Sequence, residues 1–318
     1  MKTKQLGNSD ISVPPLVIGG NVFGWTADEA TSFDLLDACM DVGFNVIDTA
    51  DVYTRMPPLQ GGESETVIGN WLKRRGARDR VVIATKVGWD MGPAGKGLSK
   101  TYIRAAVEAS LHRLQTDYID LYQAHIDDPT TPLEETLEAF GELVKEGKIR
   151  WIGASNYNPA RLKEALAVSD QLRLPRFESV QPRYNLYDRA DYEAELEVLC
   201  KEEGLGVITY FSLASGFLSG KYRAVAELEG NRRGMWLKEY FSPRGLRILK
   251  VLRDVAAQQH ATPAQVALAW VMARPGVTAP IASATSLDQL AELVASARLH
   301  LDDTALEALD AASALLEG

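Results

Sequence analysis

Asp48, Lys86 and His125 each stand at the end of a short run rich in β-branched residues, and Tyr53 follows Asp48 by five residues. Such runs indicate buried strands. In a parallel sheet with helical crossovers, the carboxyl ends of the strands meet at one face, and that face carries the chemistry. We therefore expect these four side chains to lie together.

The four side chains suit an acid-assisted attack on a carbonyl group. A phenol such as Tyr53 has a pKa of about 10, so it donates a proton poorly at neutral pH unless a cation stabilises the phenolate. Lys86 would be that cation, and Asp48 would keep it charged in a buried position. His125 can donate a hydrogen bond to a carbonyl oxygen that gains negative charge. Each residue alone also has a structural interpretation, but the joint arrangement favours catalysis.

These side chains need a scaffold of alternating strands and helices. Eight apolar runs alternate with segments of helical periodicity at intervals of roughly 30 residues. Eight such units fit a (β/α)8 TIM barrel better than an open doubly wound sheet. We expect one domain over residues 1–318, with strands at Pro15–Gly20, Asn45–Ala50, Val81–Val87, Ile119–Ile126, Ile149–Asn156, Phe177–Tyr184, Gly206–Leu213 and Ala279–Ala284.

Three additions to the barrel are expected. Two apolar pieces around a turn at residues 7–10 predict an N-terminal β-hairpin. The spacing breaks between Leu213 and Ala279, which predicts a long loop after the seventh strand. Residues Asp302–Leu316 predict an extra C-terminal helix. N-cap and proline signals predict helix starts at Thr131–Glu134, where the spacing is that of a capping box, and at Asn158–Pro159 and Thr262–Pro263.

Composition narrows the class of protein. The net charge is −9 and basic tracts are short, so nothing favours a nucleic-acid or anionic-membrane partner. No apolar run reaches the roughly 18 residues of a membrane helix. Cys39 and Cys200 both fall in helical patterns, and the N-terminal residues lack the apolar stretch of a signal peptide. We expect a reduced, cytoplasmic protein.

The chain resembles an aldo-keto reductase over nearly its whole length. The segments that carry the resemblance are Phe44–Tyr53, Gly62–Gly69, Ile83–Lys86, Asp117–His125, Ile152–Asn156 and Tyr210–Gly216. The resemblance implies that Tyr53 donates the proton, that Lys86 and Asp48 tune it, and that His125 orients the carbonyl of a small-molecule substrate. It also implies that a nicotinamide supplies hydride without a Gly-x-Gly-x-x-Gly loop, and this chain has no such loop after a strand.

The resemblance also assigns cofactor contacts. Ser155, Asn156 and Gln181 would hydrogen-bond the carboxamide, and Tyr210 would stack on the nicotinamide ring. The pyrophosphate would be wrapped by Leu213, Ser215, Gly216 and Lys221. Each set has a structural alternative: a helix start or turn for Ser155 and Asn156, aromatic packing for Tyr210, and a flexible loop for the last group.

The adenosine end departs from the family pattern. Many members place Lys or Arg near the start of the last helix to hold the 2′-phosphate of NADP, but residues 283–290 contain no cation. The N–H groups of that helix could still hold a phosphate with help from Ser283, Thr285 and Gln289, although Gln289 also has the spacing of a simple cap. Because Lys221, Arg232 or Arg233 could add the charge, we expect NADP(H) rather than NAD(H), and no metal.

The substrate pocket is expected to be aromatic. Phe23 and Trp25 would line it from the first loop, and Trp236 and Tyr240 from the seventh. Aromatic side chains around a small group of polar catalytic residues suit a hydrophobic or ring-containing aldehyde or ketone. Packing in the core or at the rim explains the same aromatics equally well.

Three other functions compete with a carbonyl reductase. A metal-dependent hydrolase would need two or three histidines at the active face, and only His125 is expected there. A Schiff-base aldolase would use Lys86 as nucleophile, but Asp48 would hold that lysine protonated. A reductase-like module that binds nicotinamide and serves a regulatory or sensing role is the third.

Overall fold

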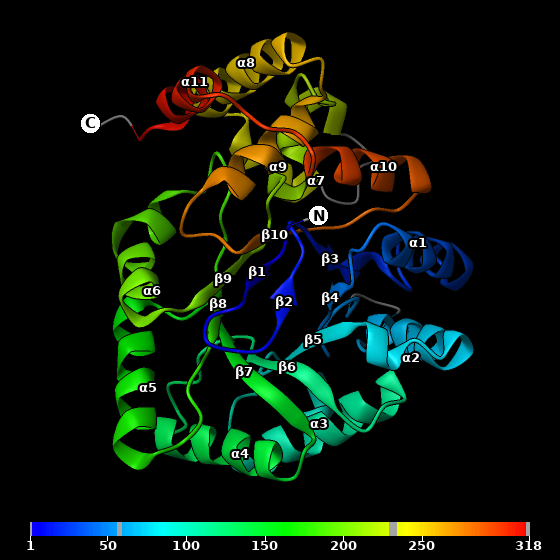
Figure 1. Cartoon of the computed structure of the whole chain (residues 1–318), viewed down its shortest axis with the longest axis vertical. Coiled ribbons are helices and arrows are strands. Elements are labelled where there is room, and N and C mark those ends of the chain that lie inside the picture. Colours follow the sequence, from blue (N-terminus) through cyan, green and yellow to red (C-terminus); the bar gives the residue numbers. More distant parts are fainter. Residues whose placement is uncertain (1, 56–58, 229–233, 316–318) are drawn as a thin grey trace.

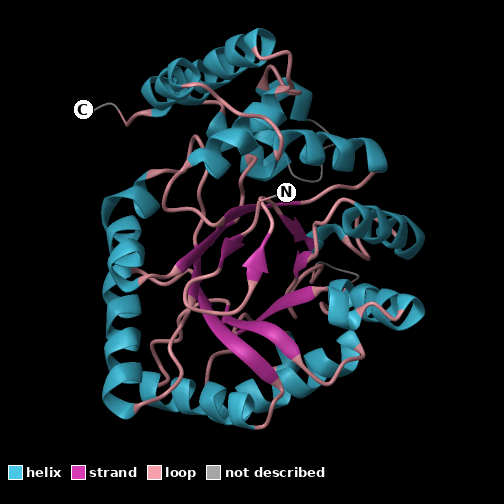
Figure 2. Cartoon of the chain, in the orientation of Figure 1, coloured by secondary structure: helices cyan, strands magenta, loops and turns pink. Residues whose placement is uncertain are grey.

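The computed structural model describes residues 2–55, 59–228 and 234–315, without the side chains of residues 235 and 236. Parallel strands form a closed barrel within this part of the chain, which confirms the predicted (β/α)8 fold (Figures 1 and 2). The barrel closes because β10 pairs with both β3 and β9. Its strands are β3 (Val17–Gly19), β4 (Val46–Asp48), β5 (Val82–Val87), β6 (Ile119–Ala124), β7 (Ile149–Ser155), β8 (Ser179–Gln181), β9 (Gly206–Thr209) and β10 (Ala279–Ala282).

The predicted N-terminal hairpin is present and covers the amino-terminal end of the barrel. It consists of β1 (Lys4–Gln5) and β2 (Ser12–Val13), which pair antiparallel. Leu6, Ile11 and Val13 are buried with inward-facing strand residues in one apolar cluster. Gly7 permits this close approach, because its φ is +57° and a Cβ atom there would lie 2.1 Å from the carbonyl oxygen of Glu178. With this end plugged, the opposite end is left for a site.

Helices surround the barrel and follow its strands in turn (Figure 2). Asn158 and Thr262 cap their helices as predicted, and Thr262 forms a full capping box with Gln265. The predicted capping box at Thr131 is wrong, because α4 begins one residue later and the Thr131 hydroxyl donates to Asp128 instead. The barrel helices are α1 (Glu29–Asp41), α2 (Glu63–Arg75), α3 (Lys100–Leu114), α4 (Leu133–Lys145), α5 (Pro159–Leu172), α6 (Glu197–Glu203), α9 (Pro263–Ala273) and α10 (Leu287–Ser296).

The segment after β9 is more ordered than the predicted long loop. Short turns of helix, including η5 (Ala214–Ser219), η6 (Val225–Leu228), α7 (Gly234–Leu237) and η7 (Lys238–Tyr240), lead into α8 (Pro243–Gln258). The predicted C-terminal helix is α11 (Asp303–Ser313), and it packs beside α8 (Figure 1). No helix of the described part is long and apolar enough to cross a membrane.

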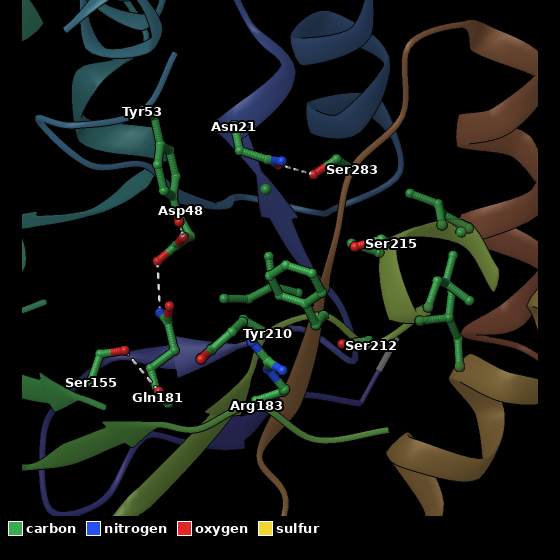
Figure 3. Close-up of a pocket in the computed structure, with 18 of the residues that line it drawn as sticks. Asn21, Asp48, Tyr53, Ser155, Gln181, Arg183, Tyr210, Ser212, Ser215 and Ser283 are labelled. Carbon is green, nitrogen blue, oxygen red and sulfur yellow. Dashed lines mark hydrogen bonds between the residues drawn. The ribbon is translucent and has the colours of Figure 1, made fainter. Parts of the chain in front are cut away.

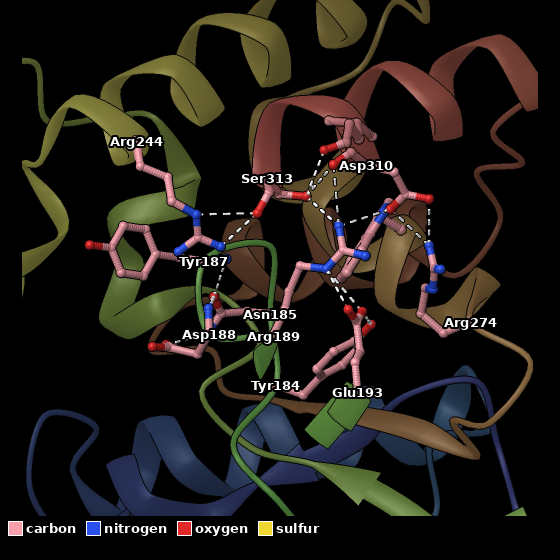
Figure 4. Close-up of polar contacts among 12 residues, drawn as sticks. Tyr184, Asn185, Tyr187, Asp188, Arg189, Glu193, Arg244, Arg274, Asp310 and Ser313 are labelled. Carbon is pink, nitrogen blue, oxygen red and sulfur yellow. Dashed lines mark hydrogen bonds and ion pairs between the residues drawn. The ribbon is translucent and has the colours of Figure 1, made fainter. Parts of the chain in front are cut away.

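Arginines from three elements hold α11 in place (Figure 4). Arg244 of α8 donates to the Ser313 carbonyl at 2.6 Å, where the last carbonyls of the helix need partners. Arg189 donates to the Ser313 hydroxyl at 2.6 Å and pairs with Asp310 at 3.2 Å. Arg274 pairs with the same carboxylate at 2.9 Å. The C-terminal helix is therefore tied to the loop that follows β8.

Candidate active site

The carboxyl ends of all eight barrel strands surround one cavity of about 880 Å³. That volume lies within the range of about 300–1,000 Å³ typical of small-molecule sites. In a barrel of this kind, loops at the carboxyl face carry the variable side chains while the strands fix their positions. One lining residue at or just after the end of each strand, in chain order, is Gly19, Asp48, Trp89, His125, Ser155, Gln181, Tyr210 and Ala282.

Asp48, Tyr53 and Lys86 form a contiguous polar group at the floor of this cavity. Lys86 Nζ donates to Asp48 Oδ2 at 2.6 Å, to the Tyr53 hydroxyl at 2.8 Å and to the Thr49 carbonyl at 2.8 Å. The Tyr53 hydroxyl donates to the same Asp48 oxygen at 3.1 Å. Lys86 is fully buried and does not line the cavity itself. It is connected to the cavity by its contacts with Asp48 and Tyr53, which do line it. The structure thus brings together three of the four residues predicted to do chemistry.

The pKa of Tyr53 moves in the opposite direction from the prediction. Burial raises it well above its usual value, and the charge of Asp48 raises it further. The expectation of a phenol made acidic by Lys86 is therefore wrong, because the sequence does not reveal how completely the phenol is removed from water. The phenol consequently holds its proton at neutral pH, which is the form that a proton donor needs.

Burial also lowers the pKa of Lys86, but the ion pair and hydrogen bond with Asp48 oppose that shift. His125 is nine-tenths or more buried, and burial followed by the charge of Lys86 lowers its pKa well below the usual value. The imidazole is therefore neutral at pH 7 and carries one N–H. Its ring lies 5.9 Å from the ring of Tyr53, edge to face, so His125 joins the other three residues.

Asp48 of β4 also connects across the barrel to Gln181 of β8, as Figure 3 shows. Gln181 Nε2 donates to Asp48 Oδ1 at 2.8 Å, and Ser155 Oγ donates to the Gln181 carbonyl at 2.8 Å. Asn156 donates from Nδ2 to the His125 carbonyl at 2.9 Å. Its Oδ1 accepts a hydrogen bond from the Tyr210 hydroxyl at 2.7 Å. The residues predicted to bind a carboxamide and a ring are therefore adjacent to the catalytic group.

The loop after β9 forms one side of the cavity. Leu213, Ser215, Gly216 and Lys221 all line it, as the sequence predicts. Ser215 has a φ of +56° and Gly216 a φ of +98°, so the backbone turns sharply here. Lys221 Nζ lies 4.8 Å from the centre of the Tyr222 ring.

The far end of the cavity is polar and carries a carboxylate. Ser283 donates to Asn21 Oδ1 at 2.6 Å (Figure 3), and Gln289 lines the cavity from α10. Thr285, which was predicted to help hold a phosphate, does not line the cavity. Its backbone N–H and hydroxyl both donate to Gln289 Oε1 instead. Glu292, one turn after Gln289, faces the cavity and was missed by sequence reasoning.

The aromatic residues predicted to bind substrate separate into two groups. Trp25 lines the cavity, but Phe23 is 1% exposed in the hydrophobic core and does not. Tyr240 is also buried, stacked on Phe217, and the side chain of Trp236 lies outside the described residues. The chain turns between these two aromatics, at Gly24 with a φ of +72°, so Phe23 packs in the core while Trp25 stays at the cavity.

Trp89 and Arg183 are among the other lining residues that the sequence analysis did not identify. Trp89 follows Lys86 by three residues, is 42% exposed and lies edge to face with His125 at 6.0 Å. Its position just past a strand end was the available signal. Arg183 lines the cavity two residues after Gln181, with its guanidinium 5.1 Å from the centre of the Phe211 ring. Among the residues that the structure describes, no three His, Cys, Asp or Glu side chains group in a way that could hold a metal ion.

Residues 15–314 match the protein-family model described as "Aldo/keto reductase family". The chain belongs to the aldo/keto reductase family. It is 36% identical over 319 residues to "Uncharacterized oxidoreductase YrpG" of Bacillus subtilis, covering 98% of this chain and 95% of that protein. It is 33% identical to "L-glyceraldehyde 3-phosphate reductase" of Escherichia coli O157:H7, covering 92% and 87%. It is 34% identical to "Probable voltage-gated potassium channel subunit beta" of Arabidopsis thaliana, covering 92% and 90%.

As an aldo/keto reductase, the protein is an oxidoreductase that interconverts carbonyl compounds and alcohols with a nicotinamide cofactor. The site fits such a cofactor in size and lining. One continuous cavity runs from Tyr53 and His125, past the amides of Asn156 and Gln181, to the polar groups at the start of α10. Amide, hydroxyl and backbone groups along this path offer both donors and acceptors to a dinucleotide.

Proposed function

We propose that the protein is an NADP(H)-dependent reductase of aldehydes or ketones, with Tyr53 as the general acid and, in the reverse direction, the general base. One observation carries this proposal: a single buried ammonium group, Lys86 Nζ, contacts both the Tyr53 hydroxyl at 2.8 Å and Asp48 at 2.6 Å. A phenol in that contact can lose its proton to substrate while the developing phenolate is stabilised.

Each residue has a distinct part in the proposed mechanism. The nicotinamide supplies hydride to the carbonyl carbon, or accepts it from an alcohol, when it is bound. Tyr53 gives its proton to the carbonyl oxygen, and the Lys86 ammonium stabilises the phenolate that remains. Asp48 keeps Lys86 charged against the cost of burial. His125, neutral at pH 7, donates a hydrogen bond that orients the carbonyl and stabilises charge on its oxygen.

The cofactor contacts follow the same order along the cavity. Ser155, Asn156 and Gln181 hold the carboxamide, and Tyr210 stacks on the ring. The loop residues Leu213, Ser215, Gly216 and Lys221 hold the pyrophosphate. Ser283, Gln289 and the N-terminus of α10 hold the 2′-phosphate, with Thr285 acting through its bonds to Gln289.

NADP(H) is favoured over NAD(H) by the helix N-terminus and by Lys221, which lines the same cavity. Arg232 and Arg233, which could add charge, lie outside the described residues. Glu292 opposes an anion at this end. Fluorescence titration with NADPH and NADH in parallel tests the preference, and we expect NADPH to bind more tightly. Tighter binding of NADH would reverse the assignment.

The substrate is proposed to be a hydrophobic or ring-containing carbonyl compound. Trp25 and Trp89 line the same cavity as Tyr53 and His125, and Trp89 lies edge to face with His125, so the cavity offers aromatic surface to a substrate. A panel of aromatic, aliphatic and charged aldehydes and ketones, assayed by the absorbance of the reduced cofactor, tests this class. Aromatic aldehydes should give the highest kcat/KM.

A regulatory or sensing module is the second candidate, favoured by the similarity to potassium channel β subunits. Such a module would bind nicotinamide and turn over slowly. Steady-state turnover on the same panel separates the two functions, because a module of this kind would bind NADPH yet show no appreciable kcat with any carbonyl.

A further inference from the structure

Asp51 is a buried carboxyl group that the proposed mechanism leaves unused. It lies in the loop between Asp48 and Tyr53 and is 2% exposed. Its backbone N–H donates to the Lys86 carbonyl at 3.5 Å, which places the residue beside β5, the strand that carries Lys86. Neither carboxyl oxygen has a hydrogen-bond partner of good geometry among the described residues, and the adjacent Val52 N–H lowers the pKa of the group by less than burial raises it. Because burying such a group without a partner costs stability, its presence needs a physical account.

Charged and titratable groups from every neighbouring element act on Asp51. Glu65 of α2 is fully buried and raises its pKa, whereas Arg113 of α3 and Lys86 of β5 lower it. Glu65 and Arg113 are themselves an ion pair at 2.7 Å. Tyr102 of α3 and Tyr122 of β6 complete the set. Since Arg113 pairs with Glu65, Lys86 is the cation acting on Asp51 that also contacts the Tyr53 hydroxyl.

These surroundings keep Asp51 protonated near neutral pH. Burial raises the pKa of Asp51 to about 8, and the charge of Glu65 adds to the rise. Asp48, three residues away, instead accepts bonds from Lys86, Tyr53 and Gln181 and has the partners of an ionised carboxylate. The two carboxyl groups, one at the end of β4 and one in the turn that follows, therefore differ in charge.

We propose that Asp51 is a positioning residue that acts through Lys86: its neutral form leaves the full ammonium charge available to Tyr53, and its ionised form weakens that support. The inference rests on the proposed function, in which negative charge develops on the Tyr53 oxygen. With Asp51 neutral, the group formed by Asp48, Lys86 and Asp51 has no net charge. Ionisation of Asp51 gives that group a charge of −1, which opposes a phenolate in a buried setting.

The pH dependence of carbonyl reduction tests this inference. We expect kcat of the wild type, at saturating NADPH and aldehyde, to fall several-fold with an apparent pKa of about 8 between about pH 6 and about pH 10. Asp51→Asn has the size of the neutral acid and cannot ionise, so it should keep the kcat of neutral pH into the alkaline range. Asp79→Asn removes an exposed carboxylate and should leave the wild-type profile unchanged.

The alternative source of an alkaline limb is loss of the Lys86 proton. Because the charge of Asp51 raises the pKa of Lys86, removing that charge would move such a limb to lower pH. An Asp51→Asn profile that is unchanged or shifted to lower pH therefore overturns the inference. Tyr53→Phe, assayed alongside, keeps the two claims apart: an active Tyr53→Phe enzyme refutes the proposed function, whereas an inactive one with an unaltered Asp51→Asn profile refutes the role of Asp51 alone.

A second measurement does not depend on activity. Infrared difference spectra of the wild type, recorded as pH is raised through about 8, should lose the carbonyl stretch of a protonated carboxyl group. The same band should be absent from Asp51→Asn at every pH. A band that persists in the variant, or no band in the wild type at neutral pH, would contradict a neutral Asp51.

Discussion

Gln181 donates a hydrogen bond from Nε2 to Oδ1 of Asp48 at 2.8 Å, and this bond joins the proposed carboxamide contact to the carboxylate that contacts the proposed proton donor, Tyr53. Asp48 uses its other oxygen for Lys86 and Tyr53. A change in Gln181 should therefore alter both cofactor binding and the chemical step.

Gln181→Leu is expected to raise the Kd of NADPH and to lower kcat, each by about tenfold, because one hydrogen bond is lost on each side, to the neutral carboxamide and to the charged Asp48. Gln123→Leu is the matched control. Gln123 contacts the same Asp48 oxygen at 3.4 Å but does not line the cavity, so the Kd of NADPH should stay within twofold and kcat should fall less. Equal effects of the two variants on cofactor affinity would argue against the assigned contact.

Lys86→Met should lower kcat by about 10²–10³ or more, since the group that stabilises the phenolate is gone. It should also destabilise the fold by about 3–5 kcal/mol, because Asp48 is left as a buried charge without its partner. The double variant Asp48→Asn with Lys86→Met should regain most of that stability and none of the activity. Chemical unfolding and steady-state kinetics measure the two effects. A stable single variant would show that the ion pair is not needed to hold Asp48.

Trp89→Ala should raise KM for aromatic aldehydes several-fold, with little loss of stability, because the side chain is half-exposed at the cavity. Phe23→Ala should instead lower the free energy of unfolding by about 3–5 kcal/mol and leave KM nearly unchanged, because that ring is in the core. Thermal unfolding and KM on one aromatic substrate distinguish them. If Phe23→Ala changed KM at full stability, the original assignment of Phe23 to the substrate pocket would be restored.

Asp51 should make the stability of the protein fall as pH rises. Its pKa in the folded state is about 8, against 3.8 for an unperturbed carboxyl, so between these values the folded protein binds more protons than the unfolded one. Stability then decreases with pH, by up to about 1.4 kcal/mol per unit. Asp51→Asn has no such proton to lose. The free energy of unfolding of the variant, measured with urea, should therefore rise relative to that of the wild type from about pH 5 to about pH 8. A difference that stays constant with pH would rule out the raised pKa.

Strand ends made much of this site predictable. Asp48, Lys86 and His125 could be placed together because each closes an apolar run, and the order of the runs fixes the order of neighbours in a parallel barrel. Helix starts at Asn158 and Thr262 were equally clear, since an N-cap followed by proline has a local physical cause.

Burial depth was not predictable from the sequence. It decides that Phe23 belongs to the core and Trp25 to the cavity, although the two residues are close in the chain. It also reverses the expected shift in the pKa of Tyr53, because desolvation outweighs a nearby cation. Helix α8 was hidden within a segment whose glycines and aromatics read as loop. Glu292 gained its position only from tertiary structure, whereas Trp89 follows the end of β5 and could have been found by the same strand-end signal.

The most direct test of the account is the kinetics of Tyr53→Phe, which removes one hydroxyl group and keeps the ring. We expect kcat for aldehyde reduction to fall by at least about 10²-fold while the Kd of NADPH stays within a few fold. A variant that reduces the same aldehyde at close to the wild-type rate would show that the proton comes from another group.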